Sequence, residues 1–276
     1  MRYGFKVNKI NGVTFLSVPS FDETGLCLTC FSTRLGGVSK APLASMNLGF
    51  GRGDKKENVL ENYHLLGKSA GFDALKTVAF SQVHGKDVCI ATKRDASEAF
   101  LPKKREFDAI ITNTPNIPIA TYHADCTPVF LLDTKNRVAG VSHAGWRGTA
   151  ARTPGEAISE MIKNFSSRPC DILAAIGPAI GKCCFETHSD VPDAMLSAYG
   201  IAAKEYITEK GNGKFLVDLP GLNLQTLLDS GIPEDNITLS EECTCCKSDL
   251  YWSHRKTGGI RGTMAAVIVL NERSDA

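Results

Sequence analysis

Apolar residues along the chain form short unbroken runs in some segments and recur at helical spacing in others. Short apolar runs that end in polar or glycine-containing turns are typical of buried strands. This pattern predicts strands over residues 25–32, 77–82, 87–92, 117–122, 128–132, 138–142, 172–176 and 264–270.

Helical spacing begins after a glycine-rich stretch at residues 49–53. We expect Asp54 to be the N-cap of this first helix, with Glu57 as its capping-box partner. Apolar side chains then recur every three or four residues until Gly71, which we expect to end the helix.

A second helical pattern follows residues 145–148 and continues to Phe165. Thr153 and Pro154 suit its start, with the threonine as the cap and the proline at the first position. If the helix begins earlier, at Gly148, the proline must lie in the first turn or kink it. Further helices are expected over residues 191–199 and 219–228.

Strands and helices are interleaved without strict βαβ alternation, which favours an α+β fold with mixed β-sheets packed together and flanking helices. The sequence contains no fixed-period repeat and no low-complexity linker. We therefore expect one domain over residues 1–276.

Composition and charge narrow the functional classes. Hydrophobic residues make up 43% and charged residues 22%, as in ordinary globular proteins. The formal net charge is +1, which gives no sign of a nucleic-acid partner. No run reaches the roughly 18 apolar residues of a membrane span, and the N-terminal segment lacks a secretory apolar run. We expect a cytoplasmic protein, in which the ten cysteines do not form a disulfide framework.

Three potential metal ligands lie at predicted strand ends. His84 and Cys126 each lie between two predicted strands, and His143 follows another. Polar residues at such positions, beside glycines, are typical of active sites, although core histidines and a core cysteine would give the same pattern. Imidazole and thiolate are natural zinc ligands, and three protein ligands leave a fourth position open.

Several segments, in order, resemble the YfiH/YlmD family, also called the multicopper polyphenol oxidase or laccase-domain family. The match begins near residue 20 and continues to the C-terminus. The segments are Phe31-Ser32-Thr33-Arg34, Gly36-Gly37-Val38-Ser39, Met46-Asn47-Leu48-Gly49, Gln82-Val83-His84-Gly85, Ala124-Asp125-Cys126-Thr127-Pro128, His143-Ala144-Gly145-Trp146-Arg147-Gly148, Ile176-Gly177-Pro178-Ala179-Ile180-Gly181 and Ser253-His254-Arg255. The resemblance implies zinc bound by His84, Cys126 and His143. One departure is Ile260-Arg261-Gly262-Thr263, where relatives more often have Thr-Gly-Arg, so the resemblance assigns this arginine no role.

The resemblance also implies phosphorolysis of adenosine, inosine and methylthioadenosine, and deamination of adenosine. A purine nucleoside and inorganic phosphate are thus the expected partners. Arg34 and Arg147 are candidates to bind phosphate, because a guanidinium group can hold it through two hydrogen bonds, and Arg255 is a third. From the matching segments we add Asn47 and Gln82 as substrate-binding candidates.

Deamination would need a proton shuttle. Zinc deaminases use a His-x-Glu segment, which is absent here. His123 and Asp125 are the candidates for that role.

Two other cysteine patterns could bind a metal. Cys27 and Cys30 have Cys-x-x-Cys spacing, but an odd separation on a strand directs side chains to opposite faces. A structural zinc site or a redox pair is also possible among Cys183, Cys184, Cys243, Cys245 and Cys246.

Three other functions remain open. Copper oxidation of phenols is one, but six histidines without a His-x-His pair are too few for a multicopper cluster. Alternatively, Cys126 is a nucleophile, activated by His84 or His143, that hydrolyses an amide bond. The resemblance implies cell-wall precursors as the substrates of such a hydrolase. The third is a zinc-stabilised binding protein without catalysis. The sequence leaves the preferred substrate, the physiological metal and the oligomeric state undecided.

Overall fold

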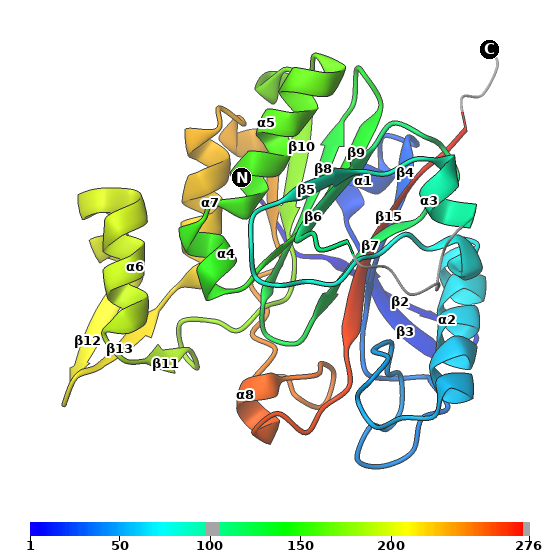
Figure 1. Cartoon of the computed structure of the whole chain (residues 1–276), viewed down its shortest axis with the longest axis horizontal. Coiled ribbons are helices and arrows are strands. Elements are labelled where there is room, and N and C mark those ends of the chain that lie inside the picture. Colours follow the sequence, from blue (N-terminus) through cyan, green and yellow to red (C-terminus); the bar gives the residue numbers. More distant parts are fainter. Residues whose placement is uncertain (98–104, 273–276) are drawn as a thin grey trace.

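Two large β-sheets form the centre of the molecule (Figure 1). A computed structural model of the chain describes residues 1–97 and 105–272. The seven-stranded sheet has the order β1-β14-β10-β8-β9-β6-β5 and mixes parallel with antiparallel pairs. Its strands are β1 (Arg2–Tyr3), β5 (Val88–Ile90), β6 (Ala109–Thr112), β8 (Thr127–Asp133), β9 (Val138–Ala144), β10 (Ile172–Ile176) and β14 (Ile237–Leu239).

The five-stranded sheet has the order β2-β3-β4-β15-β7, and all its neighbouring strands are antiparallel. Its strands are β2 (Lys6–Ile10), β3 (Val13–Ser17), β4 (Cys27–Ser32), β7 (Ile119–His123) and β15 (Met264–Leu270). The two large sheets pack face to face, with β7 and β15 against β9.

Strand β15 shows why its sequence is apolar without a break. Ile268 and its even-numbered neighbours on the strand enter the core between the two sheets, whereas Val267 and the other odd-numbered residues face helix α2 (Lys56–Ala70). Side chains alternate along a strand, so a strand covered on both faces needs apolar residues at every position.

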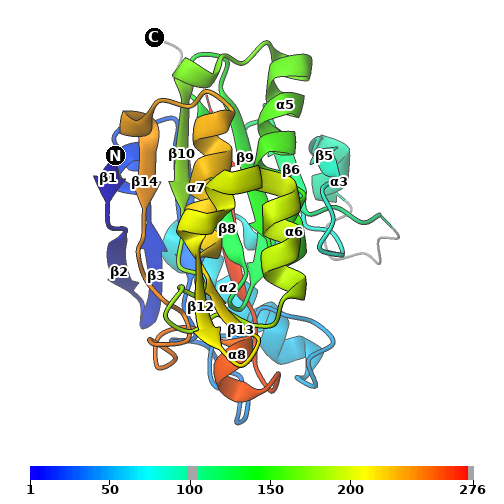
Figure 2. The ribbon, with the colours of Figure 1, turned by 90° about the vertical axis from the view of Figure 1, so that its left-hand side faces the viewer.

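Helices cover the outer faces of both sheets, which gives four layers. Helices α5 (Thr153–Phe165) and α7 (Leu219–Asp229) pack on the seven-stranded sheet, and Figure 2 shows them in front of it. Helix α2 covers the five-stranded sheet. The remaining α-helices are α1 (Pro19–Asp22), α3 (Lys93–Ser97), α4 (Trp146–Ala150), α6 (Asp190–Tyr199) and α8 (His254–Thr257). The predicted α+β fold, with mixed sheets and flanking helices, is confirmed.

A small antiparallel sheet projects from one side of the molecule (Figure 1). It consists of β11 (Glu186–Thr187), β13 (Lys214–Val217) and β12 (Ile207–Gly211), in that order. Val217 of this sheet shares a separate apolar cluster with α6 and the first turn of α7.

Most of the predicted elements are present, some with shifted ends. The strands over residues 172–176 and 264–270 have the predicted limits. The predicted strand over residues 77–82 is wrong, because this segment makes only the isolated bridges Val78–Ile119 and Ser81–Glu106. The chain here leaves the sheet and leads to His84, whose backbone is left-handed with φ 61°.

The two predicted N-caps are wrong by one residue each, and in both cases the proposed capping side chain is bonded elsewhere. Helix α2 begins at Lys56, and Asp54 instead accepts hydrogen bonds from Ser39, Asn47 and Asn58 side chains and the Lys55 amide. Helix α5 begins at Thr153 itself, whose hydroxyl donates to the carbonyls of Gly85 and Gly148.

Cys27 and Cys30 are buried in two different apolar clusters, on opposite faces of β4. They therefore do not form a chelating pair, as the odd spacing predicted. Within the described parts of the chain, no helix is long and apolar enough to cross a membrane.

Candidate metal centre

His84, Cys126 and His143, which are far apart in sequence, lie side by side. Each offers one ligand atom, and these atoms all lie within 4.8 Å of one another. Cys126 Sγ is 3.9 Å from His84 Nε2, and the two imidazole rings meet edge to face with centroids 4.9 Å apart. Two imidazole nitrogens and one thiolate fit zinc or copper, and they leave a coordination position free for another ligand.

The three ligands meet where the chain passes between the two large sheets. Cys126 lies between β7 of the five-stranded sheet and β8 of the seven-stranded sheet. His143 is the second-last residue of β9 and pairs with Pro128 of β8, so it lies next to this turn. His84 comes from the loop that precedes β5. The packed sheets therefore fix two ligands, and a loop supplies the third.

Asp108 organises two of the three ligands. It is fully buried just before β6, and its carboxylate accepts hydrogen bonds from the backbone amides of Val83, His84 and Gly85. Its Oδ1 also accepts from His143 Nδ1 at 2.8 Å. This bond leaves Nε2 of His143 for a metal ion, the arrangement that orients most metal-binding histidines. Asp108 thus holds both the His84 loop and the ring of His143.

Gly145 makes room for the ligands. A Cβ atom at this position would lie 2.7 Å from His84 Cδ2 and 3.1 Å from Cys126 Sγ. The first of these distances is too short for a carbon–carbon contact, so any side chain here would displace His84. The glycine therefore keeps open the space in which the ligands converge.

Cys126 and His143 favour each other's charged form. Burial opposes ionisation of the Cys126 thiol, but the charge of His143 and hydrogen bonds from both histidines lower its pKa to about 6. Burial likewise opposes protonation of His143, but Cys126 and the hydrogen bond to Asp108 raise its pKa. A thiolate at neutral pH is the form that binds a metal ion or acts as a nucleophile.

A cavity of about 400 Å³ opens beside the three ligands. This volume lies in the range of small-molecule sites. Its lining combines aromatic, cationic and polar side chains with the ligands: Phe50, Arg52, Phe80, Ser81, Gln82, His84, Tyr122, His123, Ala124, Cys126, His143, Arg261 and Thr263.

Gln82 and Asn47, the two predicted amide-bearing substrate residues, differ in position. Gln82 lines the cavity and bonds the backbone of Tyr122 through both its oxygen and its nitrogen. Asn47 is fully buried, and its oxygen accepts from the backbone amides of Gly49 and Thr263. Asn47 therefore joins two loops beside the cavity, and a direct substrate contact by either residue stays a prediction.

The three predicted phosphate-binding arginines lie outside the cavity lining. Arg34 stacks on Trp252 and donates to the carbonyls of Ser248 and Ala44. Arg147 is exposed and stacks on Trp146. Arg255 donates to the carbonyl of Cys184. Their phosphate-binding roles stay predictions.

The two predicted proton-transfer residues, His123 and Asp125, are both hydrogen-bonded. His123 lines the cavity, with Nδ1 3.1 Å from the Cys126 carbonyl and Nε2 2.8 Å from the Thr121 hydroxyl. Burial, and then the charge of His143, hold the pKa of His123 well below its ordinary value.

Asp125 has a left-handed backbone with φ 87°, and its two oxygens accept from the Thr244 hydroxyl and the Arg255 amide. These bonds hold the turn that carries Cys126. A catalytic role for His123 or Asp125 is still a prediction.

Three charged residues of the site were not assigned roles from the sequence. Asp108 is a single acidic residue before a short apolar run, and nothing local connects it with His84 or His143. Arg52 lies in a glycine-rich stretch, and Arg261 in the segment that departs from the family pattern. Only the fold brings these two arginines to one cavity.

Comparisons with known proteins agree with this architecture. Residues 28–271 match the family model described as multi-copper polyphenol oxidoreductase laccase. The chain is 34% identical to purine nucleoside phosphorylase YlmD of Geobacillus stearothermophilus, over 86% of this chain and 88% of the relative. It is also 34% identical to purine nucleoside phosphorylase YfiH of Escherichia coli, over 92% of this chain and 98% of the relative.

Solved structures have the same fold. The crystal structure of the hypothetical protein YfiH of Bacillus licheniformis matches with a TM-score of 0.90 at 30% identity, over 97% of this chain and 99% of that one. The crystal structure of YlmD from Geobacillus stearothermophilus also gives 0.90, at 32% identity and the same coverage. This chain therefore belongs to the family described as multi-copper polyphenol oxidoreductase laccase, together with the YfiH and YlmD proteins.

Proposed function

We propose that this protein is a zinc-dependent purine nucleoside phosphorylase that acts on adenosine, inosine or methylthioadenosine. The observation that carries the proposal is one cavity of about 400 Å³ that combines three metal ligands with two arginines and two phenylalanines. A purine nucleoside and phosphate need those kinds of contact. The relatives named purine nucleoside phosphorylase support the same reaction.

The donor set supports zinc rather than copper. A copper electron-transfer site with two histidines and one cysteine usually has a weak axial methionine. Among the described residues that line this cavity, none is a methionine. A bound zinc ion would supply Lewis-acid polarisation of an oxygen atom of the substrates.

Arg52 and Arg261 are suited to hold phosphate. Arg261 is partly buried, and its Nε has no hydrogen-bond partner among the described residues. Burial, and then the charge of Arg52, lower the pKa of Arg261 to about 10, so it still carries a positive charge near pH 7. Two adjacent cations with an unpartnered donor favour an anion in the cavity.

The proposed reaction exchanges one bond at the sugar. A phosphate oxygen forms a bond to C1′ while the bond from C1′ to the purine nitrogen breaks. The base leaves with that electron pair and takes up the proton that the phosphate gives up. The products are the free base and ribose 1-phosphate, or its 5-methylthio form when the substrate is methylthioadenosine. Phe50 and Phe80 offer aromatic surfaces for the base.

The first test is an assay of the zinc-loaded protein with inosine, adenosine and methylthioadenosine, each with and without phosphate. We expect free base and the sugar phosphate in equal amounts, and no base without phosphate. The same assay detects deamination, because adenosine would then give inosine or hypoxanthine instead of adenine. Release of no base from any of the three nucleosides would contradict the proposal.

A second prediction concerns the cavity arginines. Replacing Arg261 with glutamine removes a charged hydrogen-bond donor worth about 1.5–3 kcal/mol, so the KM for phosphate should rise about 10–100-fold. Arg147→Gln tests the competing position that the sequence predicted for phosphate, because this exposed arginine lies outside the cavity. We expect it to change the KM for phosphate less than about twofold. A larger effect at Arg147 than at Arg261 would place phosphate outside the cavity.

Amide hydrolysis is a second candidate function, and one contact series favours it. Asp108 bonds His143, which in turn hydrogen-bonds Cys126 and promotes its ionisation. This series matches the acid, base and nucleophile of cysteine hydrolases. Replacement of Cys126 separates the two functions.

A further inference from the structure

A second group of potential ligands lies outside the metal centre. Cys183, Cys184, Cys243 and Cys246 offer sulfur atoms that are all within 4.8 Å of one another. Cys246 Sγ lies 3.6 Å from Cys183 Sγ and 3.4 Å from Cys184 Sγ. In a tetrahedral site with Zn–S bonds of about 2.3 Å, neighbouring sulfurs are about 3.8 Å apart. The four sulfurs are thus close to the arrangement that one zinc ion requires.

Two tight turns bring these sulfurs together. The carbonyl of Gly181 accepts from the amides of Cys184 and Phe185, which closes the turn that carries the adjacent cysteines. In the other turn, the Cys243 carbonyl accepts from the Lys247 amide at 3.0 Å. Cys243 and Cys246 have the Cys-x-x-Cys spacing of a zinc half-site.

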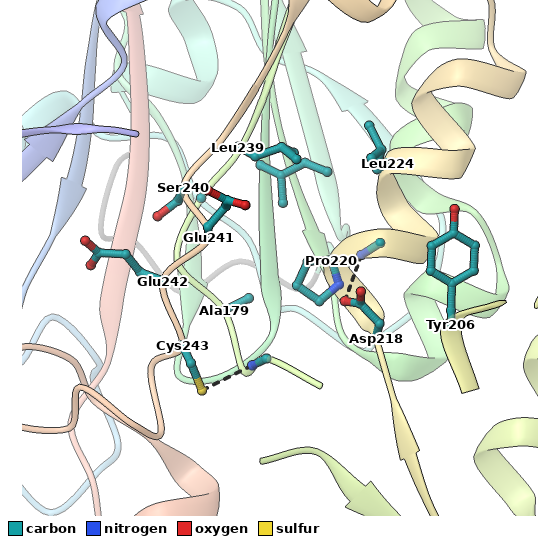
Figure 3. Close-up of a pocket in the computed structure, with 14 residues that line it drawn as sticks. Ala179, Tyr206, Asp218, Pro220, Leu224, Leu239, Ser240, Glu241, Glu242 and Cys243 are labelled. Carbon is teal, nitrogen blue, oxygen red and sulfur yellow. Dashed lines mark hydrogen bonds between the residues drawn. The ribbon is translucent and has the colours of Figure 1, made fainter. Parts of the chain in front are cut away.

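The backbone joins the two turns in register. Ala179 and Cys243 form an isolated parallel bridge, and the Thr244 amide donates to the Ala179 carbonyl at 2.9 Å. The Gly181 amide donates to Cys243 Sγ at 3.2 Å, a bond that Figure 3 shows at the edge of a neighbouring pocket. Amide hydrogen bonds to sulfur are typical of the surroundings of thiolate ligands.

The spacing of the sulfurs distinguishes a bound ion from a disulfide. A disulfide would use only two of the sulfurs, and Cys246 has two neighbours at similar distances. The geometry therefore favours one shared ion over one redox pair.

We propose that Cys183, Cys184, Cys243 and Cys246 bind one Zn²⁺ through four thiolates. All four positions around the ion would be occupied by protein, so the site is closed and structural. Cys245, which the sequence pattern also included, lies outside this group of four.

This second site would stabilise the contacts that hold Asp125 next to the ligand Cys126. Its two turns lie in the segments that hold Asp125, the residue before Cys126. The Asp125 carbonyl accepts from the Ile180 amide at 2.8 Å, and its carboxylate accepts from Thr244 and from the Arg255 amide, both at 2.7 Å. An ion that joins the two turns would fix the Ile180 and Thr244 contacts together.

The test measures zinc in the intact protein purified under reducing conditions without chelators. We expect about two equivalents per chain in the wild type, and about one after the double replacement Cys243→Ser and Cys246→Ser. His84→Ala with His143→Ala should also leave about one, held by the other site. Cys170→Ser, at an exposed cysteine away from both groups, is the control and should keep about two.

X-ray absorption of the wild type at the zinc edge needs no variant and so does not depend on whether a variant folds. One site with one sulfur and one with four average about 2.5 sulfur ligands per zinc, whereas the first site alone gives about one. One equivalent of zinc with about one sulfur would overturn the proposal. So would a disulfide among the four cysteines in the reduced, zinc-loaded protein, or two equivalents retained by the double serine variant. These results do not depend on whether the protein cleaves nucleosides.

Discussion

Replacing Asp108 with asparagine is expected to weaken zinc binding about 10–100-fold, although Asp108 itself is not a ligand. The carboxylate accepts from three backbone amides and from His143. An asparagine keeps one acceptor oxygen, and its NH₂ group would face donors that then lack a partner. The same change should lower the free energy of unfolding by about 2–4 kcal/mol, because these donors are buried. Zinc affinity from competition with a chelator and urea unfolding measure the two effects.

Asp133→Asn is the matched control. Asp133 is also fully buried, and it accepts from the amides of Lys135 and Asn136 and from the Asn136 side chain. It ends β8, whereas Cys126 lies just before the start of that strand. Its replacement should therefore destabilise the protein without changing zinc affinity. Equal zinc affinity in the two variants would mean that Asp108 does not position the ligands.

The apolar runs predicted the central strands well because both faces of those strands are covered. All seven residues of β8, β9 and β15 are buried, so each of these strands contains a run of apolar residues, which in β15 is unbroken. The pattern was not sufficient everywhere, because β3 and β6 are buried at every position and were not predicted. Exposed strands lack the signal altogether. Strand β2 is mostly exposed, and strand β12 is exposed along nearly its whole length.

Two hairpins were missed although the sequence contains their turns. Asn11-Gly12 connects β2 to β3, and Asn212-Gly213 lies between β12 and β13. All four residues have positive φ, which Asn-Gly supplies at low cost in tight hairpins. The turn signal was therefore available where the apolar pattern was weak.

The site was predictable only as far as its residues share a local pattern. His84, Cys126 and His143 were found as polar residues at strand ends, and family resemblance then selected them as ligands. Their arrangement depends on sheet pairing across long sequence separations, which no local pattern encodes. The same reason explains Arg261, which reaches the cavity from a loop before β15. Arg147, by contrast, lies beside a ligand segment in sequence but outside the cavity lining.

Cys126→Ala is expected to abolish both zinc binding and nucleoside cleavage. Removal of one of three ligands should weaken zinc binding by more than the roughly 10–100-fold that supporting residues contribute. Without the ion, the loss of several kcal/mol of transition-state stabilisation lowers kcat about 10³-fold or more. Zinc content and nucleoside phosphorolysis of the same preparation give both values.

His84→Ala is the reference for that result. His84 is a zinc ligand, but a hydrolase in which His143 is the base would not need it for catalysis. If Cys126 acts only as a ligand, the two variants lose zinc and activity together. A nucleophilic Cys126 predicts a different pair of results. Cys126→Ala would keep zinc but lose activity. Mass spectrometry of the wild type would also detect a covalent acyl adduct with an amide substrate. Zinc retained by Cys126→Ala would therefore contradict the ligand role and favour the hydrolase, because Cys126 would then serve the reaction without holding the ion.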